Sequence, residues 1–259
     1  NIVGWYGWGD KVTIFQVALF LSLALGIFSF FLPHTPPGKS SEPISWTNLI
    51  GKDAFVLFKS KSFTIFFISS VLICIPLAFY YTWANPSLTD AFILAFPNAD
   101  KDSFAIENKM SLGQVSEIIF LLMLPFAYKK WGLKKIFIIG LTAWVVRFLF
   151  FGYGTADNTP WMLYAAILLH GVCYDFFFVS GQIYIDKKAG TTIKAQAQGL
   201  ITLATYGIGM LLGNLIAGNV KDIYTISSVT TWTNVWLVPA AIASIVLVLF
   251  LFFFKQEKI

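Results

Sequence analysis

Seven stretches of this chain are apolar and about 20 residues long, the length that a helix needs to cross the hydrocarbon core of a membrane. They lie near residues 12–32, 62–86, 108–128, 134–153, 160–184, 197–219 and 233–254. Strands of a membrane barrel are shorter and alternate strictly between polar and apolar residues, and these stretches do not. The chain is therefore expected to be an all-α membrane protein with seven transmembrane helices.

The composition excludes the main soluble classes. Hydrophobic residues make up 57% of the chain and charged residues only 12%, whereas about 25% of the residues of a soluble domain are charged. The two cysteines lie inside apolar stretches without metal-ligand spacing, so neither a disulfide framework, a metal nor a cofactor is expected. In a membrane protein the net charge of +5 is a topology signal, so nucleic acid is not an expected partner.

The basic residues divide unevenly between the two sides of the predicted membrane. Of the 18 Lys and Arg residues, 13 fall on one side, four on the other, and Arg147 lies within a span. Cytoplasmic loops carry the excess of Lys and Arg. The richer side contains the C-terminus, which is therefore expected in the cytoplasm, with Asn1 outside.

One long connection suggests how the chain is organised. Residues 33–61 are polar and rich in proline, which is typical of a linker. One span precedes this segment and six follow it. We therefore expect 1–32 to end with the last helix of an N-terminal bundle that is otherwise missing, 33–61 to be a cytoplasmic inter-bundle linker, and 62–259 to form a C-terminal six-helix bundle.

Three charged residues lie within predicted spans: Glu117, Arg147 and Asp175. Each costs roughly 2.5–3.5 kcal/mol at the bilayer centre on insertion scales, so such residues usually face a cavity and serve a function. Glu117 shares a helical face with Gln114, and this amide–carboxyl pair could bind hydroxyls or the edge of a heterocycle. Arg147 is predicted to be structural, paired with Asp175 or with backbone carbonyls at helix ends.

The fifth span carries His170 and Tyr174, which are i,i+4 neighbours on one face. Asp175 is turned by about 100° from Tyr174 around the helix, so the two need not face one ligand. The aromatic ring either packs between helices or stacks on the ring of a solute. His170 either titrates or is held by structural hydrogen bonds.

Two other spans have unusual features. In the second, Pro76 removes a backbone donor and Asn85-Pro86 is expected to end the helix, with Tyr81 and Trp83 between them. This is typical either of a broken helix that lines a transport site or of a proline kink with an interfacial aromatic belt. In the sixth span, small and polar residues form a stripe, which predicts a packing seam between helices first and a cavity wall second. The stripe consists of Gln198, Thr202, Thr205, Gly209 and, through the Gly-x-x-x-Gly spacing, Gly213.

Several segments resemble one known family. The segments are Lys109–Glu117 with Leu124–Lys135, Ala143–Phe148, Gly171–Gly181, Ala195–Gly199 and Leu32–Pro36. They resemble, in that order, helix eight with its following loop, helix nine, helix ten, helix eleven and the end of helix six of bacterial nucleoside permeases. These are nucleoside:proton symporters of the major facilitator superfamily. The resemblance runs almost end to end, so the seven spans would correspond to helices six to twelve of twelve.

The resemblance implies two six-helix bundles around a central site with alternating access, a nucleoside as solute and a proton as the driving ion. It also implies roles for individual residues. Gln114 and Glu117 match nucleoside-binding positions, Tyr174 matches an aromatic position of that pocket, and His170 stands where a Tyr is found. Asp175 matches an acidic position. In the second span, Ala78 and Tyr81 stand where amides occur in the family. The candidates are thus Gln114, Glu117, His170, Tyr174 and Tyr81 for the substrate and Glu117 and Asp175 for the proton.

The sequence therefore predicts a secondary active transporter for proton-coupled nucleoside uptake in the bacterial inner membrane. A sugar or oligosaccharide symporter of the same superfamily is an alternative, because Gln114 and Glu117 would also bind sugar hydroxyls. An intramembrane enzyme with His170 or His34 as a base is a remote alternative, since the sequence lacks a nucleophile-plus-base constellation. A purely structural membrane subunit is equally remote.

Overall fold

The computed structural model of the chain describes residues 11–34 and 51–255, with the backbone alone at 11–14 and 102. The chain divides into two compact units, Asn1–Ser45 and Trp46–Ile259, each of which is described by itself. The described part of the first unit is one helix, α2, at Lys11–Ser29. This helix has no charged residue after Lys11 and is apolar on all sides, as is typical of a helix that lies in lipid or among other helices.

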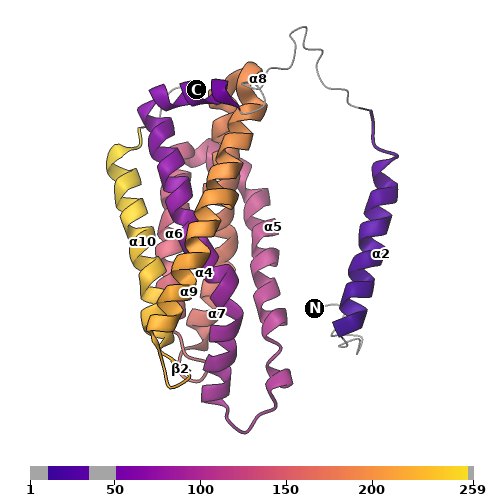
Figure 1. The fold of residues 1–259 in the computed structure, drawn as a ribbon, viewed down its shortest axis with the longest axis vertical. Coiled ribbons are helices and arrows are strands. Elements are labelled where there is room, and N and C mark those ends of the chain that lie inside the picture. Colours follow the sequence, from indigo (N-terminus) through magenta and orange to yellow (C-terminus); the bar gives the residue numbers. More distant parts are fainter. Residues whose placement is uncertain (1–10, 35–50, 256–259) are drawn as a thin grey trace. The chain divides into compact units, whose positions relative to one another are not determined.

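The second unit is a bundle of long helices that lie side by side (Figure 1). Its helices are η1 at Lys52–Lys59, α4 at Lys61–Ala95, η2 at Lys101–Phe104, α5 at Ile106–Trp131, α6 at Leu133–Tyr153, α7 at Pro160–Tyr174, η3 at Asp175–Val179, α8 at Ser180–Thr202, η4 at Leu203–Gly209, α9 at Met210–Ile223 and α10 at Trp232–Phe253. Strands β1 (Thr225–Ile226) and β2 (Val229–Thr230) form a small antiparallel hairpin between α9 and α10.

The helical run from residue 160 to 223 is two membrane-spanning helices. Its 64 residues would extend about 96 Å as one helix, three times the thickness of a hydrocarbon core. The run is broken inside α8 at Gly190, whose φ of 66° and ψ of −169° are not helical. The described helices thus match the seven predicted spans. Within both halves of this run, η3 and η4 are π-helical turns, a feature that is frequent at functional sites.

The prediction that Asn85-Pro86 ends the second span is wrong. Helix α4 continues through both Pro76 and Pro86 to Ala95. Proline is tolerated inside a membrane helix where other groups satisfy the freed backbone.

The predicted packing seam is present where α9 and η4 cross α4. A Cβ atom added at Gly213 would lie 2.6 Å from the Ala78 Cβ, and one at Gly209 would lie 2.7 Å from the Cys74 Cβ. Such distances are too short for real carbon atoms, so the helices approach this closely only because both residues are glycines. Elsewhere the core is aromatic, with Trp236 of α10 stacked on Phe148 of α6 at 5.7 Å between ring centroids.

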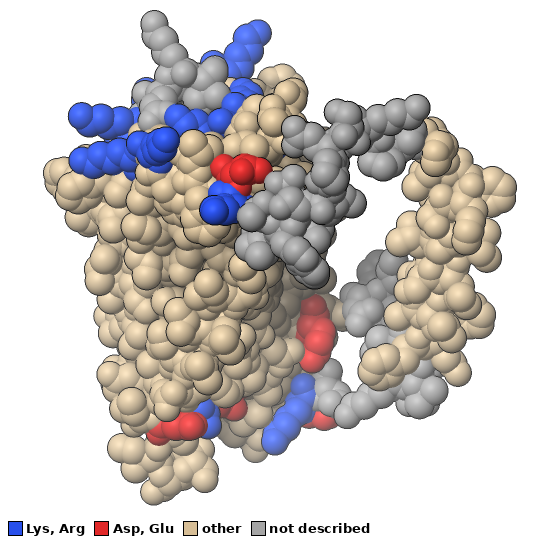
Figure 2. All heavy atoms as spheres, turned by 45° about the horizontal axis from the view of Figure 1, so that its top comes forward, with Lys and Arg blue, Asp and Glu red and all other residues tan. Residues whose placement is uncertain are grey.

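On the face that Figure 2 shows, most charged residues gather at the two ends of the bundle, and most of the surface between them is uncharged. We call one end the lysine end. Its basic residues are Lys52, Lys59, Lys61, Lys129, Lys130, Lys134, Lys135, Lys187, Lys188, Lys194 and Lys255. The opposite end, which we call the hairpin end, carries three described lysines alongside Asp90, Asp100, Glu107, Asp157 and Asp222.

Candidate functional site

Three polar side chains from three helices form a hydrogen-bonded row inside the bundle. The His170 ring of α7 lies in the middle, with its Nε2 atom 2.8 Å from Glu117 Oε1 of α5. Its Nδ1 atom lies 2.8 Å from Arg147 Nη1 of α6. Arg147 and His170 are 0% and 4% exposed, whereas 30% of the Glu117 side chain is exposed. The row therefore runs from a buried guanidinium to a partly accessible carboxylate, and we call it the central triad.

The chemistry of arginine fixes the direction of both hydrogen bonds in the central triad. A guanidinium group has only donors, so Nδ1 of His170 must accept from Arg147 Nη1. A neutral imidazole that accepts at one nitrogen carries its hydrogen on the other. Nε2 of His170 therefore donates to Glu117 Oε1. The result is a neutral histidine that links a cation to an anion and uses one of the two Glu117 oxygens.

The predicted pairing of Arg147 with Asp175 is wrong, because Arg147 donates to His170 instead. Its guanidinium also lies over the Tyr80 ring at 3.6 Å from the centroid and reaches the buried Cys173 Sγ at 3.5 Å. Two guanidinium nitrogens, Nε and Nη2, have no hydrogen-bond partner among the described residues. The arginine is therefore stabilised largely by its cation–π contact with Tyr80 and by its hydrogen bond to His170 in the central triad.

The central triad is positioned by a tight crossing of α5 and α7. The Ser116 hydroxyl accepts from the Gly171 backbone N–H at 3.0 Å and donates to the Gly113 carbonyl at 2.7 Å. A Cβ atom at Gly171 would lie 2.5 Å from the Ser116 carbonyl carbon. Only glycine allows this approach, which sets Glu117 and His170, the residues next to Ser116 and Gly171, within hydrogen-bond distance.

Asp175 stands apart from the triad at the start of η3. It is 3% exposed, and its Oδ2 atom has no hydrogen-bond partner among the described residues. A buried charged group without a partner is costly. An ionised Asp175 carboxylate would therefore be unfavourable at this position.

Aromatic side chains border the exposed side of the triad. Tyr174 follows His170 by one helical turn, with 5.8 Å between ring centroids, and its hydroxyl lies 2.6 Å from that of Tyr206 in η4. Tyr81 is 53% exposed, and its ring centroid lies 5.7 Å from that of Tyr80, which in turn lies 5.0 Å from that of His170. The sequence analysis did not identify Tyr206. The glycine-rich pattern of the sixth span was interpreted mainly as helix packing, although the single tyrosine within that span could have indicated a site residue.

Two other predicted residues lie away from this group. Trp83 donates through Nε1 to the Ala217 carbonyl at 3.0 Å and packs beside Trp232, so it braces α9 and α10. Gln114 is exposed on α5, one turn before Glu117, with its amide beside the Met110 and Ser111 carbonyls. Among the described residues, no group of three or more His, Cys, Asp and Glu side chains could hold a metal ion.

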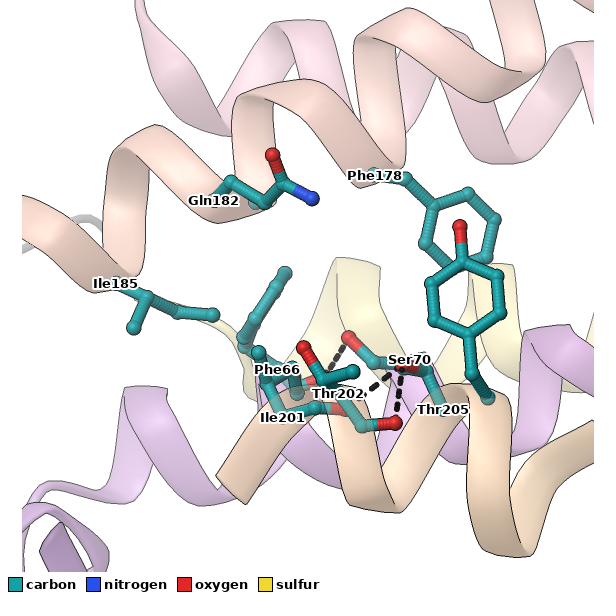
Figure 3. Close-up of a pocket in the computed structure, with 10 residues that line it drawn as sticks. Phe66, Ser70, Phe178, Gln182, Ile185, Ile201, Thr202 and Thr205 are labelled. Carbon is teal, nitrogen blue, oxygen red and sulfur yellow. Dashed lines mark hydrogen bonds between the residues drawn. The ribbon is translucent and has the colours of Figure 1, made fainter. Parts of the chain in front are cut away.

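A recess opens beside Tyr206, between α4, the η3–α8 region and η4 (Figure 3). It contains about 350 Å³ of atom-free space, including the part open to the surroundings. Its lining is uncharged and mixes hydroxyl, amide and aromatic groups: Phe66, Ser70, Phe178, Gly181, Gln182, Ile185, Ile201, Thr202, Thr205 and Tyr206. Part of the predicted stripe in the sixth span is thus a cavity wall as well as a seam.

Comparison with known proteins gives the family. The sequence model described as nucleoside H+ symporter matches residues 2–258. The chain belongs to this family. Its relatives include YegT of Escherichia coli K12, which is 42% identical over 244 residues, and the nucleoside permease NupG of the same organism, 36% identical over 250. The xanthosine permease of Escherichia coli K12 is 32% identical over 240 residues.

Solved structures of a family member have the same fold. The crystal structure of the nucleoside transporter NupG matches this symporter-family chain with a TM-score of 0.73 at 33% identity. Its D323A mutant matches with a TM-score of 0.80 at 32% identity. These matches cover 99% and 98% of this chain. The chain is thus a multi-pass, all-α membrane protein with the fold of the major facilitator superfamily, as predicted.

The chain spans little more than half the length of the relatives it matches. The sequence matches cover 91%, 92% and 91% of this chain but only 55%, 57% and 57% of YegT, NupG and the xanthosine permease. The matches to the two NupG structures cover 64% and 63% of the solved chains.

Proposed function

We propose that this chain is the C-terminal part of a proton-coupled nucleoside transporter that works by alternating access. The observation that carries the proposal is the central triad, because it presents a partly exposed carboxylate held by a buried cation through a histidine. Family membership and relatives named as nucleoside and xanthosine permeases favour this function over sugar transport. None of these relatives is named as an enzyme.

Glu117 is proposed to bind the solute and to carry the proton. One of its oxygens accepts from His170, so the other can accept from a ribose hydroxyl. Protonation of the carboxylate would remove the negative end of the triad and leave the Arg147 charge unbalanced. A conformational change could relieve that imbalance, which is how proton binding would be coupled to access.

The remaining predicted residues are proposed to complete the site around Glu117. Gln114 offers an amide one turn from Glu117, and Tyr174 and Tyr81 offer rings on which a base could stack. Asp175 is proposed as a second proton carrier because its buried carboxyl has an oxygen without a partner.

The arrangement in the membrane follows from the charges. We propose that the lysine end faces the cytoplasm, with the C-terminus on that side and the protein in the bacterial inner membrane. Residues 1–32 would then end the N-terminal bundle, 33–61 would link the bundles in the cytoplasm, and 62–259 would form the C-terminal bundle, so that the spans correspond to helices six to twelve. Residues 35–50 of the linker lie outside the described part.

The test is uptake of labelled uridine by vesicles that contain the full-length protein. Accumulation should require an inward proton gradient. Glu117→Gln should abolish accumulation against a gradient and retain part of the uridine exchange, because an amide can still bind hydroxyls but cannot carry the proton. Glu107→Gln is a matched control, since Glu107 lies on the same helix, is exposed and bonds Asn85 at 3.2 Å.

Accumulation by the Glu117→Gln protein equal to that of the parent would reject the proton role. Uptake of labelled lactose in place of uridine and adenosine would reject the nucleoside assignment and support the sugar alternative.

A further inference from the structure

Three lysines from three different helical segments converge on the end of α10, at the lysine end of the bundle. Lys134, in the first turn of α6, has its Nζ atom 3.4 Å from the Leu251 carbonyl oxygen. Lys61, the first residue of α4, has its Nζ atom 5.9 Å from the centroid of the Phe253 ring. Lys255 lies just beyond the end of α10. The end of this one helix thus brings three positive charges together, and we call the three lysines the lysine corner.

The lysine corner is held in place by the packing beneath it. Phe254, next to Lys255, is 1% exposed, and its ring stacks on that of Phe250 with 4.3 Å between the centroids. The Lys255 carbonyl oxygen accepts from the Ser62 hydroxyl at 2.7 Å, which joins the end of α10 to the start of α4. Because the helix ends that carry the lysines are joined to one another, binding an anion there needs little ordering of the backbone.

No carboxylate balances these three charges among the residues that the structure describes. Within that part, the acidic residues of the lysine end are Asp53 and Asp186, and they bond Gln196 and Lys194 instead. Helix α6 also begins at the corner with two lysines in its first turn, no acidic residue there and no capping side chain. The N-terminal end of a helix favours an anion. The lysine corner is therefore an unbalanced positive site.

An apolar stripe leads from the lysine corner along α10. Phe252, Val248 and Ile245 are each more than half exposed, and their spacing of four and three residues places them on one face of the helix. Helix α10 packs mainly on α6 and α4 (Figure 1) and contributes no residue to the central triad. In a transporter whose second bundle faces the triad, this stripe is left to the acyl chains of the membrane.

We propose that the lysine corner binds the headgroup of an anionic phospholipid. The phosphate would lie between Lys61, Lys134 and Lys255, and the acyl chains would lie along the apolar stripe of α10. A phosphodiester accepts charge-assisted hydrogen bonds from ammonium groups, and clusters of lysine beside transmembrane helices attract anionic headgroups. The adjoining apolar stripe favours a lipid over free phosphate. This site is separate from the proposed solute site, so the inference goes beyond the proposed function.

The experiment measures the Kd of lipids for the purified full-length protein by native mass spectrometry. Phosphatidylglycerol should bind more tightly than phosphatidylcholine, whose choline group cancels the charge of the phosphate. The triple variant Lys61→Gln/Lys134→Gln/Lys255→Gln should weaken the binding of phosphatidylglycerol at least about tenfold, because glutamine keeps a polar side chain but loses the charge. The binding of phosphatidylcholine should change less than about twofold, since no net charge is involved.

A second triple variant, Lys52→Gln/Lys129→Gln/Lys130→Gln, is the matched control. It removes the same charge from the same end of the bundle, but its lysines lie on η1 and α5, whereas α10 packs mainly on α6 and α4. We expect it to weaken phosphatidylglycerol binding less than about threefold. Equal weakening by the two triple variants would mean a general attraction to the lysine end and would overturn the proposal. Equal affinity of the parent for the two lipids would overturn it as well.

Lys255→Gln alone tests the site without a risk to folding. This side chain is exposed and has no hydrogen bond or ion pair with the described residues. The variant should bind phosphatidylglycerol about fivefold more weakly, the effect of losing about 1 kcal/mol, and should unfold at the temperature of the parent in detergent without added lipid. Excess glycerol 3-phosphate, which has the charge without the acyl chains, should not displace the bound lipid. Displacement by it would overturn the assignment to a lipid.

Discussion

His170 determines how the charges of the central triad are connected, because one ring accepts while it also donates. The guanidinium of Arg147 can only give hydrogens, and the ionised carboxylate of Glu117 can only receive them. A replacement at 170 is therefore compatible with both neighbours only if it has an acceptor and a donor. Glutamine and tyrosine meet that requirement, and phenylalanine does not.

Substitutions at His170 should distinguish the contribution of the side chain's size to stability from that of its two hydrogen bonds. His170→Phe keeps a buried ring but leaves Arg147 without its nitrogen acceptor and Glu117 without its donor. Removing one member of a buried charged network costs about 3–5 kcal/mol. His170→Gln should cost less, since its amide can accept from Arg147 and donate to Glu117. Thermal unfolding of the purified full-length protein checks the order, and equal losses for the two variants would contradict it.

At Tyr174 the ring and the hydroxyl should have different effects. Tyr174→Phe removes the hydrogen bond to Tyr206 but keeps the ring, so we expect most nucleoside binding to remain. Tyr174→Ala should raise the apparent KM for uridine about tenfold if a stacking contact near 1.4 kcal/mol is lost. Uptake kinetics of the two variants decide this. Parent-like kinetics in the alanine variant would show that Tyr174 does not contact the base.

The intramembrane residues illustrate what the sequence could predict. The cost of a charge in lipid identified Glu117, Arg147 and Asp175, because that cost depends on residue type alone. It could not identify the partners. Arg147 meets His170 rather than Asp175 because His170 in α7 and Asp175 at the start of η3 point in different directions, and which direction faces α6 depends on how the helices cross.

At the scale of the helices, glycine decides how closely α5 and α7 approach. Gly171→Ala would place a methyl group 2.5 Å from the Ser116 backbone and force the two helices apart. Overpacking of this kind costs about 1–3 kcal/mol. We also expect uridine uptake to fall, because separation of the helices lengthens the Glu117–His170 hydrogen bond. Unfolding and uptake assays measure the two effects.

Gly218→Ala serves as the comparison for this helix-contact prediction. A Cβ atom at Gly218 would meet nothing within 4 Å, so this change should leave both stability and uptake close to those of the parent. Equal behaviour of the two alanine variants would mean that the α5–α7 crossing does not hold the triad.

Hydropathy predicted the existence of the helices better than their ends. The run around Pro86 was expected to stop because proline removes a backbone donor, yet α4 continues to Ala95. The break at Gly190, by contrast, lies in a polar, lysine-rich stretch that hydropathy had already placed outside the membrane. Local composition predicts such a break, whereas the continuation of a membrane helix through proline depends on the folded structure.

For the molecule as a whole, the distribution of charge predicts orientation. Fluorescent protein fused after residue 259 of the full-length protein should fluoresce, because its fusion point would lie in the cytoplasm. Alkaline phosphatase inserted between Ser227 and Ser228, in the hairpin at the opposite end, should be active because that enzyme needs the periplasm. The reverse pair of activities would show that the lysine end faces outward.

The burial of Cys74 and Cys173, each 0% exposed, has a practical consequence. One lies under the crossing of α4 and η4, and the other lies against Arg147. A thiol with no accessible surface is shielded from water-soluble alkylating reagents. Both sulfurs should therefore remain unlabelled by such reagents, and single cysteines introduced along α5 or η4 could report solvent access without first replacing these two.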